Sequence, residues 1–221
     1  MEHVLSNTSN TSNTSNTSNT SSTSTYIFDG YTLTQSKRNE LFGSCDKGAG
    51  TSSPENYQRQ TISTLTKIPC LKTNVRINLR NNTLKEICYP NKHCDGFDYS
   101  ENFDGIQTIL QTTIKTIPQT TSKTIYINLK CIVGSGGSQT RSLREVYWFV
   151  EGQLNVLLHQ SKTESSNNIF FANILDGDQA FSVFDKFKYL LELPDYSSIK
   201  QNIYVGDLKN YFNWFDIICS L

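Results

Sequence analysis

The stretch Thr124-Ile-Tyr-Ile-Asn-Leu-Lys-Cys-Ile-Val133, followed at once by Gly134-Ser-Gly-Gly-Ser-Gln-Thr-Arg141, decides the fold of this chain. Every second side chain from Ile125 to Val133 is apolar, which predicts a β-strand with one face in a core. A lysine inside such a strand is unfavourable unless a partner or a function holds it there. The glycine-rich turn then allows a helix to begin abruptly. The other face of the strand carries Tyr126, Asn128, Lys130 and Ile132.

Outward from this strand, apolar periodicity predicts alternating helices and strands. Helices are expected over 36–42, 54–65, 139–159, 181–191 and 207–215, and further strands over 73–79, 106–117, 169–175 and 202–205. The segment 118–122 reads as a turn, so the strands on its two sides should form a hairpin. The order of elements predicts an α/β domain with a mixed central sheet flanked by helices.

The N-terminal segment differs from the rest of the chain in composition. Residues 7–21 repeat Asn-Thr-Ser five times, and such a polar tract has nothing to bury. We expect 1–25 to be a disordered tail and 26–221 to form a single domain. The sequence carries no signal-peptide pattern and no apolar run of membrane-spanning length. An intracellular protein, cytoplasmic or nuclear, with reduced cysteines is therefore expected.

The charges balance to zero, with 20 basic and 20 acidic residues, but they are unevenly distributed. Residues 1–150 hold 15 Lys and Arg against 11 Asp and Glu, whereas residues 151–221 hold 5 against 9. Between residues 67 and 92 there are six cations and a single acid, Glu86. A local basic surface of this kind attracts phosphates. A merely solvated face is the plainer alternative.

Two short motifs flank the predicted hairpin. Phe103-Asp104-Gly105 precedes its first arm, and Asn128-Leu129-Lys130 lies on its second arm, with Asp104 and Asn128 24 positions apart. This pattern resembles the PD-(D/E)xK nuclease superfamily and, within it, type II restriction endonucleases. The family core is a helix, a three-stranded meander, a helix and a strand, which matches the order predicted from about residue 54 to 175.

The resemblance implies a magnesium-dependent endonuclease that hydrolyses double-stranded DNA and acts as a homodimer. Lys130 would be the catalytic lysine, and Gln139, on the following helix, would contact the scissile phosphate. Arg141 and Arg144 would contact the DNA backbone. The implied metal ligands are Asp104, Asn128, Glu101 and Glu55, with Glu40 and Asp98 as further candidates for completing the site.

Asn128 stands where the family usually has Asp or Glu. An asparagine offers a carbonyl oxygen to a metal but no charge, which favours a second hypothesis: a nucleic-acid-binding protein on the same fold that does not cleave. A non-enzymatic interaction protein is a third.

Plainer interpretations of the same residues remain open. Lys130 could be an edge-strand lysine paired with an acid, and Asp104 could belong to an ordinary Asp-Gly turn. Asp176-Gly177-Asp178 could be a second acidic site or, more simply, a helix start capped by Asp178. A zinc site would use Cys70, Cys88, His93 and Cys94, whose spacing matches no standard finger.

Overall fold

The computed structural model describes residues 29–43, 53–86, 100–113, 119–162 and 168–221. Predictions for the tail, for Asp98 and for three of the four zinc candidates lie outside these residues. The helices are α1 (Gln35–Phe42), α2 (Ser53–Thr66), α3 (Gly137–Lys162), α4 (Asp178–Phe181), α5 (Phe184–Leu191) and α6 (Leu208–Ser220). The strands are β1 (Val75–Asn78), β2 (Thr83–Glu86), β3 (Ser100–Asn102), β4 (Gly105–Thr113), β5 (Gln119–Cys131), β6 (Ile169–Asp176) and β7 (Ile203–Gly206).

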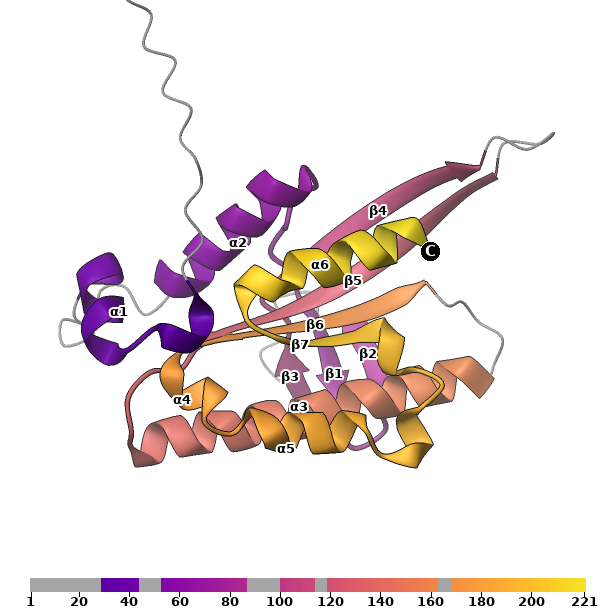
Figure 1. Ribbon diagram of the computed structural model, residues 1–221. Coiled ribbons are helices and arrows are strands. Elements are labelled where there is room, and N and C mark those ends of the chain that lie inside the picture. Colours follow the sequence, from indigo (N-terminus) through magenta and orange to yellow (C-terminus); the bar gives the residue numbers. More distant parts are fainter. Residues whose placement is uncertain (1–28, 44–52, 87–99, 114–118, 163–167) are drawn as a thin grey trace, which may run out of the picture.

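A mixed sheet of four strands, in the order β4-β5-β6-β7, forms the centre of the fold (Figure 1). The pair β4 and β5 is antiparallel, as expected for the arms of one hairpin, whereas β6 runs parallel to both β5 and β7. Parallel neighbours need a crossover connection. Helix α3 connects β5 to β6, and α4 with α5 connects β6 to β7. The predicted α/β class with a mixed central sheet is confirmed.

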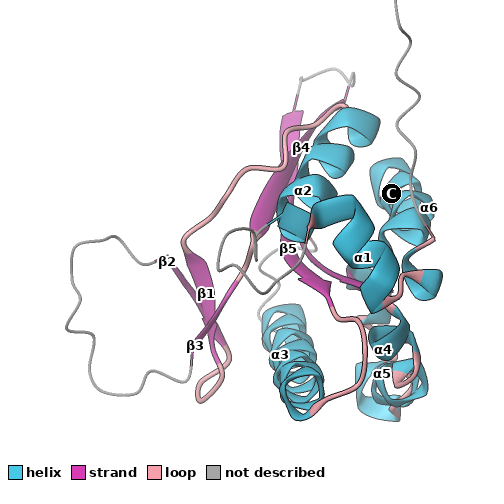
Figure 2. Ribbon diagram, turned by 90° about the vertical axis from the view of Figure 1, so that its left-hand side faces the viewer, coloured by secondary structure: helices cyan, strands magenta, loops and turns pink. Residues whose placement is uncertain are grey.

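A second sheet, in the order β2-β1-β3, stands apart from the first (Figure 2). The expectation of one three-stranded meander was therefore wrong, because β1 does not join β4. A tight turn, in which Asn82 adopts a left-handed conformation (φ 54°) and donates to the Asn78 carbonyl, folds β1 onto β2 instead. The segment before β1 meets β4 through an isolated bridge between Leu71 and Ile106 and through the Gln107 side chain, which donates to the Ile68 carbonyl at 2.8 Å.

The strand β5 alternates as predicted. Ile125, Ile127 and Leu129 are fully buried and belong to the core beneath α2 and α6. Tyr126 packs with the core on the opposite face, beneath α3 and α5. The strand β6 is buried on both faces, as its nearly continuous apolar sequence indicates.

The predicted helix 181–191 is broken into α4 and α5, and its start also differs from expectation. Gly177, not Asp178, is the N-cap of α4. The Asp178 carboxylate accepts a hydrogen bond from the Gly134 amide at 3.0 Å, so it fastens the glycine-rich turn after β5. Among the described helices, none is long and apolar enough to cross a membrane.

Candidate active site

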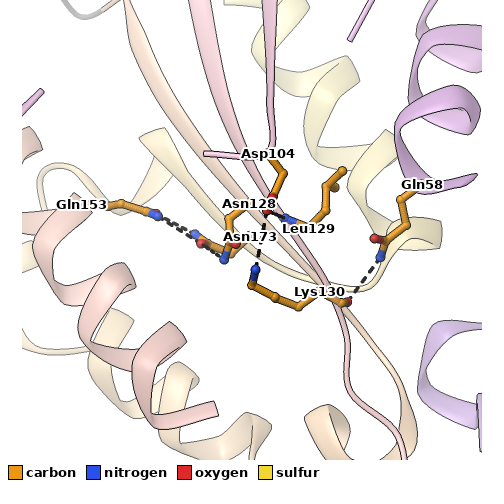
Figure 3. Close-up of polar contacts among 7 residues, drawn as sticks. All are labelled: Gln58, Asp104, Asn128, Leu129, Lys130, Gln153 and Asn173. Carbon is orange, nitrogen blue, oxygen red and sulfur yellow. Dashed lines mark hydrogen bonds and ion pairs between the residues drawn. The ribbon is translucent and has the colours of Figure 1, made fainter. Parts of the chain in front are cut away.

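Asp104 lies where the chain passes from the small sheet to the large one. Its backbone N–H donates to the Ile127 carbonyl at 2.8 Å, and its Oδ2 accepts a hydrogen bond from the Leu129 N–H at 2.8 Å. The same Oδ2 lies 3.8 Å from the Lys130 Nζ (Figure 3). The two motifs predicted from sequence are therefore adjacent in space, and Lys130 has an acidic partner.

This ion pair is partly exposed, with 41% of the Lys130 side chain and 28% of the Asp104 side chain accessible. Pairs of this kind contribute little to stability because water screens them. Stability alone therefore gives no strong reason for a lysine at this position of β5.

Asn128 lies two residues before Lys130, so the two side chains point to the same face of the sheet. Asn128 is buried in an amide network (Figure 3). Its Nδ2 donates to the Asn173 Oδ1 on β6 at 3.1 Å. Asn173 and Gln153 of α3 exchange two further hydrogen bonds, of 3.0 and 2.6 Å. The amide nitrogen of Asn128 is thus committed to holding β5 against β6.

A cavity of about 170 Å³ opens beside Lys130 on the face toward α3. Glu101 from β3 and Glu145 from α3 line it together with Asn128 and Ser142. Glu145 is not among the site residues predicted from the sequence. Its signal is helical spacing: Glu145 lies on the same face of α3 as Ser142 and the buried Phe149.

The two glutamates that line this cavity have like charges, which repel each other. The pKa of Glu101 is raised, first by burial and then by the nearby Glu145, while Lys130 and Arg76 lower it and Asp104 raises it slightly. A neighbouring like charge disfavours the ionised form of Glu101. A bound cation would relieve that repulsion.

Glu55, in the first turn of α2, also feels the ion pair. Burial raises its pKa, Lys130 lowers it and Asp104 raises it. Its Oε2 is buried and has no hydrogen-bond partner. Glu40 is an exposed residue of α1 that lines none of the cavities described here.

The predicted DNA contacts on α3 diverge. Arg144 lies 5.7 Å from the centre of the Trp148 ring and lines an apolar cavity between α3 and α5, away from Lys130. Successive residues of a helix are turned by about 100°, so Arg144 does not share the cavity of Glu145 beside Lys130. Its contact with DNA stays a prediction. Gln139 accepts a hydrogen bond from the Ser138 hydroxyl at 2.7 Å, and Arg141 is exposed in the same part of the helix.

The predicted ligands do not form a complete metal cage. Among the described residues, no three His, Cys, Asp or Glu side chains come together closely enough to hold a metal ion. Magnesium, however, is commonly held by one or two carboxylates together with water and substrate phosphates. The carboxylate of Asp104 and one of the two glutamates beside Lys130 would suit that kind of site.

The second acidic candidate, Asp176, makes the buried contacts of a structural residue. Asp176 is completely buried; its Oδ1 accepts from the Leu208 N–H at 3.1 Å and its Oδ2 from the Gln58 Nε2 at 2.6 Å. Burial is the first cause that raises its pKa to about 7. Gln58 also donates to the Lys130 carbonyl at 3.3 Å, so Asp176 supports the end of β5 from behind.

Comparison with known proteins finds no matching family model, no matching curated protein and no matching solved structure. The functional argument therefore depends on the residues and their geometry.

Proposed function

We propose that this chain is a magnesium-dependent DNA endonuclease of the type II restriction class, with a site of the PD-(D/E)xK kind. The observation that carries the proposal is the contact between Asp104, which directly precedes β4, and Lys130 on the neighbouring strand β5, 3.8 Å apart. The order β4, β5, α3, β6 supports it, because the family core also has two antiparallel strands, a helix and a further strand in succession.

Asp104 and Glu145 would hold the metal together with water and substrate phosphates, and Glu101 lines the same cavity as Glu145. Magnesium bound there supplies an activated water and neutralises charge on the phosphate. Lys130 orients the attacking water and stabilises the negative charge that develops on the phosphate oxygens. Gln58 positions Lys130 by holding its backbone carbonyl from the opposite face of the sheet.

A second candidate function is nucleic-acid binding without cleavage. Asn128 favours it, because this residue brings no charge and its amide nitrogen is occupied by Asn173. In the proposed enzyme, Glu145 supplies the acid that position 128 lacks.

Plasmid cleavage tests the proposal. Unmethylated supercoiled plasmid is incubated with Mg²⁺ and the purified protein, and the rate at which discrete fragments appear is measured. Lys130→Ala, Asp104→Asn and Glu145→Gln should each reduce that rate by roughly 100-fold or more. The exposed residues Lys188 and Asp216 provide matched controls: Lys188→Ala and Asp216→Asn should cleave as the unchanged protein does.

Cleavage that survives Lys130→Ala and Asp104→Asn would remove the site from the proposal. Tight DNA binding without any cleavage in Mg²⁺ would favour the second candidate function.

A further inference from the structure

A second cavity, of about 290 Å³, lies beside the candidate active site. It shares Asn102 with the cavity that holds Glu101 and Lys130, and Asp104 borders it. Segment 102–104, which joins β3 to β4, therefore separates two adjoining cavities. The first is acidic apart from Lys130, whereas the second is basic.

Three cations from different parts of the chain line this basic cavity. Arg59 comes from α2, Lys72 from the segment before β1, and Arg76 from β1. None of the three has a carboxylate within ion-pair distance in the part of the chain that the structure describes. The acid at the edge of the cavity, Asp104, is already paired with Lys130.

The hydrogen bonds of the two arginines leave donors available. Arg59 donates through Nη1 to the Asn56 Oδ1 at 2.8 Å, but its Nε is buried and has no partner among the residues that the structure describes. Arg76 donates through Nη1 to the Ser100 hydroxyl at 3.4 Å. A buried donor on a cation without an acceptor is unfavourable. An anion in the cavity would satisfy it.

We infer that this cavity binds a phosphodiester group of the nucleic-acid strand, next to the phosphate that is cleaved. The inference rests on the proposed function, because the scissile phosphate lies at Asp104 and Lys130 in that proposal. Phosphates recur at short, regular intervals along a strand. A strand that crosses segment 102–104 therefore brings one phosphate to the acidic cavity, where a metal is held, and a neighbouring one to the basic cavity.

Arginine and lysine have different roles in this site. The planar guanidinium groups of Arg59 and Arg76 donate in fixed directions and suit phosphate oxygens. Lys72 is exposed and adds a less directional charge at the rim. The amide groups of Asn74 and Asn102 provide further donors.

DNA binding without metal tests the inference. Anisotropy of a short fluorescein-labelled duplex is measured in EDTA, so that no cleavage occurs, between about 50 and 200 mM NaCl. Arg59→Gln, Lys72→Gln and Arg76→Gln should each weaken binding by roughly five- to tenfold at the lower salt concentration. Each should also reduce the slope of log affinity against log salt by about 1. Lys72→Arg should retain the slope, and Lys188→Gln, on α5, should match the unchanged protein.

Wild-type affinity and slope in all three Gln variants would overturn the inference. So would weaker binding with an unchanged slope, since the residue would then act through folding rather than through phosphate contact. Plasmid cleavage by the unchanged protein is scored separately: cleavage with unaltered binding in the variants rejects this subsite alone. Binding that depends on the three cations, without cleavage, rejects the nuclease proposal and retains the phosphate site.

Discussion

Asn128 occupies the position where an acid would complete the motif, and its neighbours explain why an amide is accommodated there. Its Nδ2 faces the Asn173 Oδ1, which also accepts from Gln153. A carboxylate would face that oxygen unless the amides of Asn173 and Gln153 both turned over. Turning both preserves their two mutual hydrogen bonds and presents the Asn173 Nδ2 to position 128.

Asn128→Asp is therefore expected to fold, with a loss of about 1–3 kcal/mol in unfolding free energy. The added charge lies on the same sheet face as Lys130 and should lower the Mg²⁺ concentration needed for half-maximal plasmid cleavage. A Mg²⁺ titration of the cleavage rate measures this. Asn213→Asp, at an exposed position of α6, is the control. An unchanged Mg²⁺ requirement would mean that position 128 is not near the metal.

Single residues also show the limit of motif-based inference. Asp104 and Lys130 were found by their spacing, because two arms of a hairpin bring such positions together. Glu145 was missed because its partner Glu101 is 44 positions away in the chain. Arg144 lines another cavity than Glu145, and a charge near the start of a helix does not by itself indicate which side of the helix it occupies.

At the scale of elements, the turn between β6 and α4 joins three segments behind the site. Gly177 donates its N–H to the Gly30 carbonyl at 2.7 Å, and the next residue, Asp178, holds the Gly134 N–H. Gly177 has a φ of 115°, in the region that favours glycine. A Cβ at this position would collide with the Ile132 carbonyl.

Gly177→Ala should therefore lower the free energy of unfolding by at least about 2 kcal/mol, since both the backbone conformation and the contact oppose it. Urea unfolding followed by circular dichroism measures the change. Gly137→Ala is a matched control, because a Cβ there meets no atom within 4 Å, and it should be neutral or slightly stabilising. Equal stability of the two variants would contradict this account of the turn.

Most elements were predictable because they follow local periodicity. The strand β5 alternates and α3 repeats its apolar residues at helical spacing. The ends of α3 lie within three residues of the expected ones, whereas β5 begins at Gln119, inside the segment expected to be a turn. The division into two sheets was not predictable in this way. Strand pairing depends on contacts between distant segments, and the tight turn at Asn82 directs β1 to β2 rather than to β4.

At the scale of the whole molecule, Asp176 ties together elements from both ends of the chain. Its carboxylate accepts from Gln58 of α2 and from the Leu208 N–H at the start of α6. Burial raises the pKa of this carboxyl to about 7 from its ordinary value of 3.8. Between these two values the folded protein retains a proton that the unfolded chain has lost, so stability falls as the pH rises through this window.

Asp176→Asn should remove this part of the pH dependence. The unfolding free energy of the unchanged protein should fall from pH 4 to pH 7 by an amount on the order of 4 kcal/mol more than that of the variant. The new amide can donate to the Gln58 Oε1 once the Gln58 amide turns over, which gives up the Gln58 hydrogen bond to the Lys130 carbonyl and lowers stability by a similar amount at every pH. Urea unfolding at several pH values measures the difference. Asp216→Asn should keep the wild-type dependence, and parallel curves for Asp176→Asn would contradict the raised pKa.

The sequence by itself determined most of the helices, the four strands of the large sheet, the alternation of β5 and the pairing of Asp104 with Lys130. These follow from side-chain period and from the short path around one hairpin. Only the tertiary structure decided that Glu101 and Glu145 share a cavity with Lys130, that Asn128 is held in an amide network, and that three cations converge beside Asp104. Such groupings join residues far apart in the chain, and their positions depend on how whole sheets and helices pack, which no local pattern records.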